Sequence, residues 1–249
     1  GDDWIDADMY ERMLSAALSW QADMAICLYR RVYRDHTEDA STNRAAVFEG
    51  QEALQVYVEE REEYDIQNAA WNKLYRREVL QELRFSVGKW YEDVVFSAKA
   101  LGRAGRCVYL DSAAYNYIID REGSIMNVKI NSRTFTDQIP AYRERSDYLC
   151  SLGREDLADI HDYFVYKRLL LFYNQVKKSG MPEKKDYLNK IANVINEGRA
   201  DFERIYGCIA ANPNERKKME LFLKSPRLYW GVMCINEAVI LPLKRRRRR

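Results

Sequence analysis

Two pairs of adjacent carboxylates are the side chains of this sequence best suited to chemistry. Asp2 and Asp3 precede Trp4 and a helix-like segment, and Glu92 and Asp93 begin a second helix-like segment. Carboxylate oxygens bind hard divalent cations and accept protons, so each pair is a candidate catalytic group. Acidic residues are also favoured at helix N-termini, where they cap the helix or interact with its dipole. Taken alone, each pair fits this structural interpretation at least as well.

Three further segments lie at specific places relative to these pairs. Trp71-Asn72-Lys73-Leu74-Tyr75 lies between them, and Tyr115-Asn116-Tyr117 follows the second pair. Arg121-Glu122-Gly123-Ser124-Ile125 comes next. The order of all these segments along the chain is more informative than any one of them.

The ordered set resembles the family-2 glycosyltransferases that build bacterial polysaccharides. In that family an Asp-x-Asp-Asp-Trp-Ile segment, a Trp-Asn-Lys-Leu-Tyr segment, a Glu-Asp-Val-x-Phe helix start and a Tyr-x-Tyr...Arg-x-Gly-Ser-Ile segment follow one another. The resemblance covers residues 2 to 127. It implies an inverting hexosyltransferase of the GT-A type, which moves a sugar from a nucleotide-sugar to an acceptor hydroxyl. The implied acceptor is a glycan or a lipid-linked molecule, in cell-surface polysaccharide or glycolipid synthesis.

The resemblance also implies roles for the carboxylates. Asp2 and Asp3 match the metal motif, in which Mg²⁺ or Mn²⁺ bridges aspartate and the nucleotide diphosphate. Asp93 matches the general base that takes the proton from the acceptor hydroxyl, and Glu92 is the second candidate.

The substrate-binding residues follow from the same resemblance. Trp71, Asn72 and Lys73 would line the acceptor side, where an indole can stack on a sugar and polar groups can bind its hydroxyls. Arg121 and Ser124 would lie in a loop that closes over the diphosphate, since a guanidinium suits phosphate geometry. A core position for Trp71 and a solvated turn for Arg121 are the alternatives.

The sequence departs from the family pattern at its beginning. Relatives carry a strand-rich nucleotide-binding half before the metal motif, and Gly1 occupies the position between the motif's aspartates. We therefore expect this chain to be an inactive fragment in isolation. The alternative function is a non-enzymatic helical interaction module attached to a degenerate glycosyltransferase remnant.

The elements that must position these residues indicate an α+β fold that is mostly helical. Residues 1–132 are expected to form the C-terminal half of a GT-A-like catalytic domain, and residues 133–249 a helical region with a basic tail. Periodicity predicts helices over residues 7–20, 48–62 and 69–83 and from Glu92 onward, and strands over 24–32, 106–110 and 113–119 around an Asp-Ser turn. In the second region, Ser225-Pro226 is typical of a helix start.

Composition limits the partners and the compartment. Six positive charges lie in residues 244–249, so the rest of the chain is net negative and nucleic-acid binding is not expected. The five cysteines are widely spaced, which favours a reducing cytoplasmic setting. Residues 228–243 are apolar and precede the basic run, so residues 228–249 are predicted to lie against the inner face of the cell membrane unless that helix packs on the domain. A homo-oligomer is left open.

Overall fold

The computed structural model describes residues 2–119 and 130–240, and the chain divides into two compact units, residues 1–157 and 158–249. The division falls inside helix α5 (Glu155–Lys178). The first unit contains the sheet and the helices that cover it, and the described residues of the second form helices joined by turns. The predicted boundary after residue 132 lies within the first unit, because helix α4 (Ile139–Ser151) packs on helix α3 (Glu92–Arg103).

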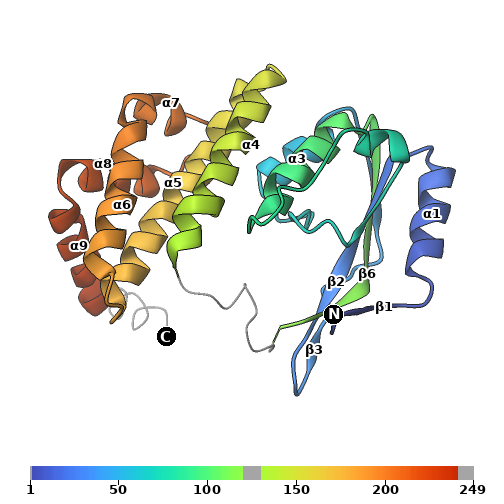
Figure 1. Ribbon diagram of the computed structural model, residues 1–249, viewed down its shortest axis with the longest axis horizontal. Coiled ribbons are helices and arrows are strands. Elements are labelled where there is room, and N and C mark those ends of the chain that lie inside the picture. The colour runs from blue at the N-terminus through green and yellow to red at the C-terminus, as the bar shows by residue number, and fades with distance from the viewer. Residues whose placement is uncertain (1, 120–129, 241–249) are drawn as a thin grey trace. The chain divides into compact units, whose positions relative to one another are not determined.

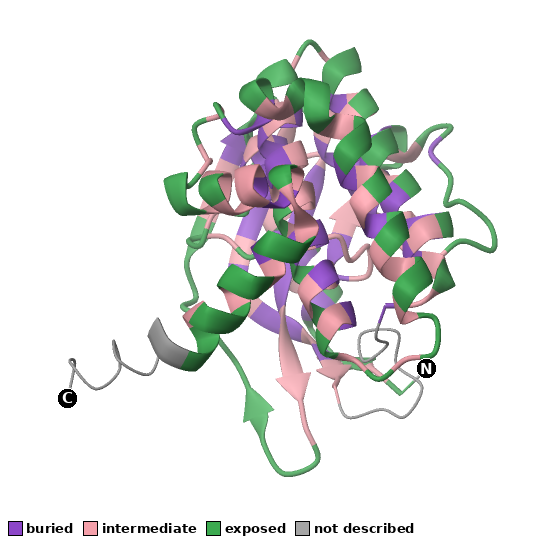
Figure 2. Ribbon diagram, turned by 90° about the vertical axis from the view of Figure 1, so that its left-hand side faces the viewer, coloured by how far each residue is buried: buried purple, intermediate pink, exposed green. Residues whose placement is uncertain are grey.

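Two long parallel strands form the centre of a six-stranded mixed sheet. They are β2 (Met24–Val32) and β6 (Arg106–Ile118), paired from Met24 with Cys107 to Val32 with Ile118. Four shorter strands pair antiparallel with them: β1 (Trp4–Ile5) and β4 (Ala45–Glu49) with β6, and β3 (Thr37–Glu38) and β5 (Lys73–Tyr75) with β2. The parallel pair is buried over much of its length, as is typical of strands covered on both faces. Figure 2 shows this buried centre and the exposed end of the β2–β3 hairpin.

Helices cover both faces of the sheet, but unequally. Helix α1 (Met9–Ser19) lies on one face, against β2 and β6, and buries Met9 and Met13. Helix α3 lies on the opposite face (Figure 1), where it packs against helix α2 (Glu52–Val58). The outward side of α1 is apolar: Tyr10, Leu14 and Leu18 are 53%, 51% and 70% exposed. Because these residues recur every four positions, they form one stripe along the helix.

The second unit consists of α5 and a set of shorter helices. These are α6 (Lys184–Glu197), the 3-10 turn Gly198–Asp201, α7 (Phe202–Ile205), α8 (Pro213–Lys224), α9 (Pro226–Ile235) and the π-helical turn Asn236–Ile240. An aromatic group joins α5, α8 and α9, with ring centroids of Tyr173 and Phe222 4.9 Å apart and those of Phe222 and Tyr229 5.3 Å apart. No helix within residues 2–119 and 130–240 has the length and apolarity needed to cross a membrane.

Several sequence predictions are confirmed. The mixed α and β character is present, the strand over residues 24–32 is β2, and the helix within residues 7–20 is α1. Ser225 caps α9 by accepting a hydrogen bond from the Leu228 N–H, with Pro226 at the first position of the helix.

The helix predicted over residues 69–83 is wrong. This segment contains β5 and a 3-10 turn, Arg77–Leu80. Its apolar residues suit a helical period, but Lys73, Leu74 and Tyr75 pair with the first residues of β2. The tertiary hydrogen bonds of the sheet override the local pattern here.

Two other predictions need correction. Residues 48–62 are helical only over Glu52–Val58, since Phe48 belongs to β4. Residues 106–119 form one strand, not two strands around a turn, although the register shifts beside Leu28. Asp111 continues the strand because the neighbouring segment, residues 42–44, supplies partners for it. The Thr42 hydroxyl donates to the Asp111 carboxylate, and the Asp111 N–H donates to the Arg44 carbonyl at 2.8 Å.

Candidate active site

Asp93 lies in the first turn of α3, as predicted. The residue before the helix, Tyr91, has a left-handed backbone conformation with φ of 64°, which is uncommon for a residue with a side chain. Burial and the neighbouring charge of Glu92 raise the pKa of the Asp93 carboxyl, while the charge of Lys73 and the first-turn N–H groups oppose this shift. A partly buried carboxylate with a raised pKa is suited to accepting a proton.

The turn before α3 is held by the segment that leads into α4. The buried carboxylate of Asp137 accepts from the Trp90 N–H at 3.2 Å and from Lys89 Nζ at 3.1 Å. Arg133 donates to the Gly88 carbonyl at 3.1 Å, and its guanidinium lies 4.7 Å from the Trp90 ring centroid. These contacts fix the path of the chain into Glu92 and Asp93.

Asn72 and Lys73, at the start of β5, have buried side chains. Asn72 is 0% exposed and donates to the Cys27 carbonyl at 2.6 Å. Lys73 is 4% exposed, and burial lowers the pKa of its ammonium to about 7. Their predicted contact with acceptor hydroxyls stays a prediction, and both side chains are already hydrogen-bonded to the protein.

Trp71 lies flat on an aromatic surface formed by strand β6. Its ring centroid is 3.8 Å from that of Tyr115 and 5.8 Å from that of Tyr117, with interplanar angles of 24° and 14°. Tyr29 of β2 meets Trp71 edge to face at 5.2 Å. Tyr115 and Tyr117 share one face of the sheet because side chains alternate along a strand. The half-buried indole is therefore both packed against the sheet and partly accessible.

Asp3 is connected to this aromatic surface. Its carboxylate accepts from the Tyr115 hydroxyl at 3.0 Å and from the Ile118 N–H at 3.0 Å. Each carboxylate oxygen keeps a second lone pair, so these contacts leave Asp3 able to bind a cation. Asp2 beside it is exposed. Two carboxylates fit Mg²⁺, which usually takes one or two protein carboxylates together with phosphate oxygens and water. Among the described residues, no group of three or more His, Cys, Asp or Glu side chains could hold a metal ion.

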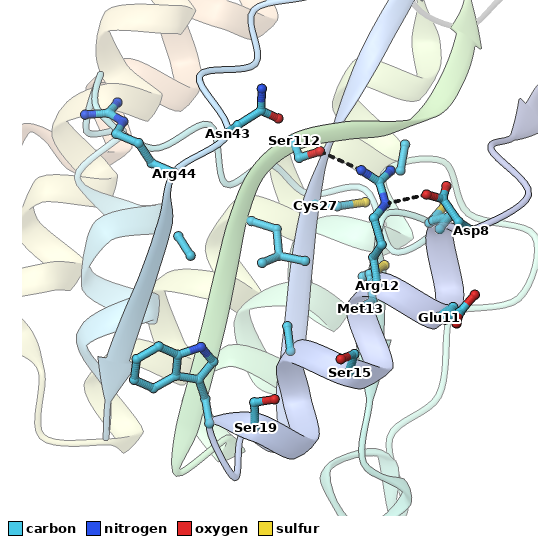
Figure 3. Close-up of a pocket in the computed structure, with 16 residues that line it drawn as sticks. Asp8, Glu11, Arg12, Met13, Ser15, Ser19, Cys27, Asn43, Arg44 and Ser112 are labelled. Atoms are coloured by element: carbon cyan, nitrogen blue, oxygen red, sulfur yellow. Dashed lines mark hydrogen bonds and ion pairs between the residues drawn. The ribbon is translucent and has the colours of Figure 1, made fainter.

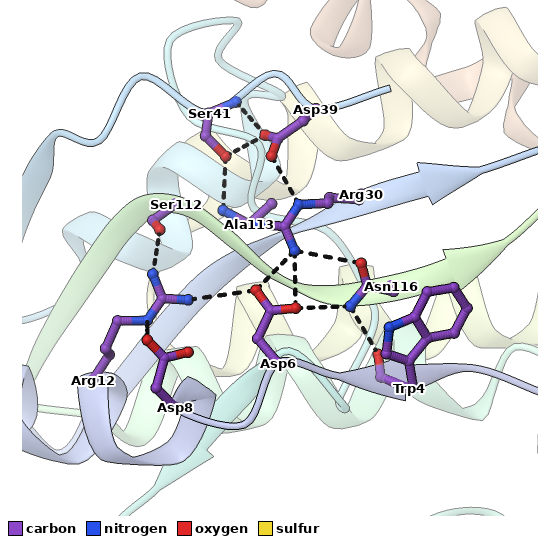
Figure 4. Close-up of polar contacts among 10 residues, drawn as sticks. All are labelled: Trp4, Asp6, Asp8, Arg12, Arg30, Asp39, Ser41, Ser112, Ala113 and Asn116. Atoms are coloured by element: carbon purple, nitrogen blue, oxygen red, sulfur yellow. Dashed lines mark hydrogen bonds and ion pairs between the residues drawn. The ribbon is translucent and has the colours of Figure 1, made fainter. Parts of the chain in front are cut away.

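A network of charged residues holds the segment after Asp2 and Asp3 (Figure 4). The Arg30 guanidinium donates to both carboxylate oxygens of Asp6, at 3.0 and 2.8 Å, and to Asp39 at 2.9 Å. Asn116 donates to Asp6 at 3.0 Å, and the hydrogen bonds from Arg30 and Asn116 lower the pKa of Asp6. The network joins β1, β2 and β6 on the face of the sheet that carries α1.

The structure thus brings the predicted residues into two neighbouring groups. One contains Asp3, Tyr115 and Trp71, and the other contains Lys73 and Asp93. Arg121 and Ser124 lie outside the described residues. Sequence reasoning missed Arg30, Tyr29 and Asp137, which lie far along the chain from the motifs that they contact. Asp6 could have been predicted from the sequence, since this residue directly follows Trp4 and Ile5 of the first motif.

A cavity of about 580 Å³ lies beside α1, on the face of the sheet opposite α3 (Figure 3). Arg12 and Ser112 line it and are joined by a hydrogen bond of 2.9 Å, and Met13 and Cys27 contribute apolar surface. Its lining does not include the predicted catalytic or substrate-binding residues. Together with the apolar stripe of α1, it makes this face of the sheet less completely covered than the α3 face.

The fold is that of a nucleotide-sugar-binding glycosyltransferase of known structure. S. aureus TarS 1-349 in complex with UDP-GlcNAc matches with a TM-score of 0.67 and 17% identity, covering 95% of this chain and 65% of the TarS chain. The same protein in complex with UDP matches with a TM-score of 0.63 and 16% identity, covering 95% and 64%. At this identity the likeness establishes the fold.

Two glycosyltransferases are similar in sequence, and no protein-family model matches. GlyA of Streptococcus pneumoniae is 26% identical over 168 residues, which are 61% of this chain and 22% of GlyA. EpsH of Bacillus subtilis, assigned as a glycosyltransferase, is 25% identical over 186 residues, which are 72% of this chain and 53% of EpsH. The chain therefore spans about half or less of the length of these relatives. Glycosyltransferase similarity, as the motifs indicated, is confirmed by both relatives.

Proposed function

We propose that this chain is the acceptor-side part of an inverting family-2, GT-A type glycosyltransferase that uses a nucleotide-sugar donor. The observation that carries the proposal is the placement of Asp93: a partly buried carboxylate with a raised pKa, in the first turn of α3 and near the buried Lys73. The similarity to GlyA and EpsH and the TarS-like fold support the same class of enzyme.

In the proposed reaction, Asp93 accepts the proton of the acceptor hydroxyl as that oxygen bonds to the anomeric carbon of the donor sugar. The bond between the anomeric carbon and the diphosphate breaks, and the electron pair leaves with the nucleoside diphosphate. Attack opposite to the leaving group inverts the configuration. Asp2 and Asp3 would supply carboxylate oxygens to hold Mg²⁺ or Mn²⁺, and such an ion would contribute positive charge that stabilises the diphosphate leaving group.

The acceptor side is proposed to include the accessible face of Trp71. An indole that is already stacked on Tyr115 presents a rigid apolar surface on which a sugar ring can lie. The acceptor would be a glycan or lipid-linked saccharide of the cell surface. Because TarS was solved with UDP-GlcNAc and UDP, uridine diphosphate sugars are the first donors to test.

We further propose that residues 1–249 alone do not catalyse sugar transfer. Most of the energy that positions the donor comes from contacts to its nucleotide and diphosphate. The apolar stripe of α1 at Tyr10, Leu14 and Leu18 supports additional polypeptide packing on that face of the sheet. Calorimetry of this chain with nucleotide-sugars and Mn²⁺ tests the point, and a micromolar dissociation constant would contradict it.

The test of the assigned base is Asp93→Asn in the natural polypeptide that contains this chain. The substitution keeps the shape of the side chain but removes its ability to take a proton, so turnover should fall by about 10² to 10⁴-fold. Glu92→Gln, one residue away in the same turn, is the matched control and should have a smaller effect. Near-normal turnover of Asp93→Asn would remove Asp93 from the mechanism.

A further inference from the structure

The loop that leads into β5 has an unusual set of hydrogen bonds. Residues 67–70 present four consecutive backbone carbonyls, and each accepts a hydrogen bond from a side chain. Lys73 Nζ donates to the carbonyls of Gln67, at 2.8 Å, and of Ala69, the Ser97 hydroxyl to that of Asn68, and the Tyr75 hydroxyl to that of Ala70, at 3.3 Å. Backbone carbonyls of loops are commonly hydrated, so side-chain partners at every position indicate a loop held in one conformation.

Lys73 supplies two of these four contacts, and all three of its N–H donors are hydrogen-bonded within the protein. An ammonium group has three N–H donors, and the third is directed to Asn72 Oδ1 at 3.0 Å. A buried ammonium is costly unless each donor is paired. With three acceptors around it and 4% of its surface exposed, Lys73 has no donor left for a substrate hydroxyl.

The loop joins two parts of the candidate active site. At one end it continues into Trp71, which lies on Tyr115. In its middle, the Asn68 side chain accepts from the hydroxyl of the buried Tyr57, and the oxygen of that hydroxyl lies 3.4 Å from the Val94 carbonyl in the first turn of α3. Arg145 of α4 donates to the same Tyr57 hydroxyl at 2.7 Å. A displacement of the loop would therefore reach both the indole and the turn that carries Asp93.

We propose that Lys73 is a positioning residue: by holding the carbonyls of Gln67 and Ala69, it fixes the loop that sets Trp71 relative to the first turn of α3. It does not itself bind the acceptor. The roles of Trp71 and Asp93 in transfer rest on the proposed function, whereas the positioning of Trp71 by Lys73 does not.

The experiment uses the natural polypeptide labelled with 5-fluorotryptophan, without substrate. The ¹⁹F resonance of Trp71 is assigned by Trp71→Phe. Lys73→Met keeps an unbranched side chain that is one atom shorter and removes the donors, so the Trp71 resonance should shift, broaden or split. Ser97→Ala removes the bond to the Asn68 carbonyl from the α3 side and should act on the same resonance. Lys99→Met, which breaks the exposed 2.8 Å ion pair of Lys99 with Glu144, is the control and should leave it unchanged.

An unchanged Trp71 resonance in folded Lys73→Met would overturn the proposal, and if that variant does not fold, the result for Ser97→Ala decides. Steady-state kinetics separate the two roles further. A positioning residue predicts a fall in kcat, whereas an acceptor ligand predicts a raised KM for acceptor with an unchanged resonance. Normal turnover of Asp93→Asn would refute the proposed base and leave the fluorine result standing.

Discussion

Lys73 on β5 and Asp93 in the first turn of α3 lie close enough for the charge of each to shift the pKa of the other. Lys73 favours the ionised form of Asp93, and Asp93 favours the protonated form of Lys73. Burial acts on both in the opposite direction and is the larger effect for each. The two residues are 20 positions apart in sequence. They come together because β5 pairs with β2 in the sheet and α3 covers one face of that sheet.

The first prediction concerns the pH profile of transfer. Lys73→Met removes a positive charge that lowers the pKa of Asp93, so the pKa of this carboxyl should rise further. A general base acts only when deprotonated, and the acidic limb of the kcat/KM profile should therefore move to higher pH. The profile of Lys99→Met should match that of the wild type. An unmoved limb in Lys73→Met would show that Asp93 is not the group that titrates.

The second prediction concerns stability. The raised pKa of Asp93 means that the folded state keeps a proton which the unfolded state has released, so stability falls as pH rises from about 3.9 through the folded-state value. Asp93→Asn removes this cost. Its melting temperature should be higher than that of the wild type at pH 7, with a smaller difference at pH 3.5.

Asp137→Asn is the matched control for this effect, and its sign is opposite. Hydrogen bonds from Trp90 and Lys89 oppose the effect of burial and lower the pKa of Asp137 to about 2. The stability that this carboxylate contributes is present above about pH 3.9 and is lost as pH falls toward 2. Asp137→Asn should therefore melt at a lower temperature than the wild type at pH 7. Equal changes in the melting temperatures of Asp93→Asn and Asp137→Asn would refute the opposite directions of the two pKa shifts.

The third prediction tests the packing of α3 on α4. A methyl group at Gly102 would collide with the Tyr148 hydroxyl and contact Leu152, so Gly102→Ala should destabilise the first unit by about 1–3 kcal/mol. Adding Tyr148→Phe removes the hydroxyl and should restore part of the loss. Gly231→Ala in α9 meets nothing within 4 Å and should stabilise its helix by about 0.5–1 kcal/mol. Urea unfolding of the three variants measures these effects, and a neutral Gly102→Ala would contradict the close approach.

The fourth prediction concerns a membrane surface, which we propose as the partner of α9. Leu228, Val232 and Ile235 are 54%, 39% and 58% exposed and share one side of this helix, while Tyr229 is buried. The helix is followed in sequence by Lys244 and five arginines. Deleting residues 244–249 should weaken co-sedimentation with phosphatidylserine-containing vesicles by about 10-fold or more, since each cation contributes about 1 kcal/mol near an anionic surface.

Point variants separate the apolar contribution from the basic one. Val232→Glu should reduce binding to the same vesicles, because it places a charge on the exposed apolar side of α9. Ile209→Glu changes a residue that is 92% exposed but lies outside α9, and should bind as the wild type does. Equal binding of the full chain and the chain lacking residues 244–249 would exclude the electrostatic contribution.

Local sequence was sufficient for features that depend on neighbouring residues. Ser225 and Pro226 specify the start of α9 because a side-chain acceptor and a missing N–H both suit the first turn. The apolar run of residues 24–32 predicts β2, and acidic residues at the start of an apolar helix predict the placement of Glu92 and Asp93. The motifs were also sufficient to indicate the glycosyltransferase similarity that GlyA and EpsH confirm.

Tertiary structure decided which way the motif side chains are used. Trp71, Asn72 and Lys73 are adjacent in sequence, yet the indole is partly accessible while the amide and the ammonium are buried and paired. No local pattern distinguishes these outcomes, because they depend on β5 pairing with β2 and on Ser97, Tyr57 and Arg145 arriving from other helices. The energy of a buried polar group is set by its partners, and those partners are brought together only when the chain folds.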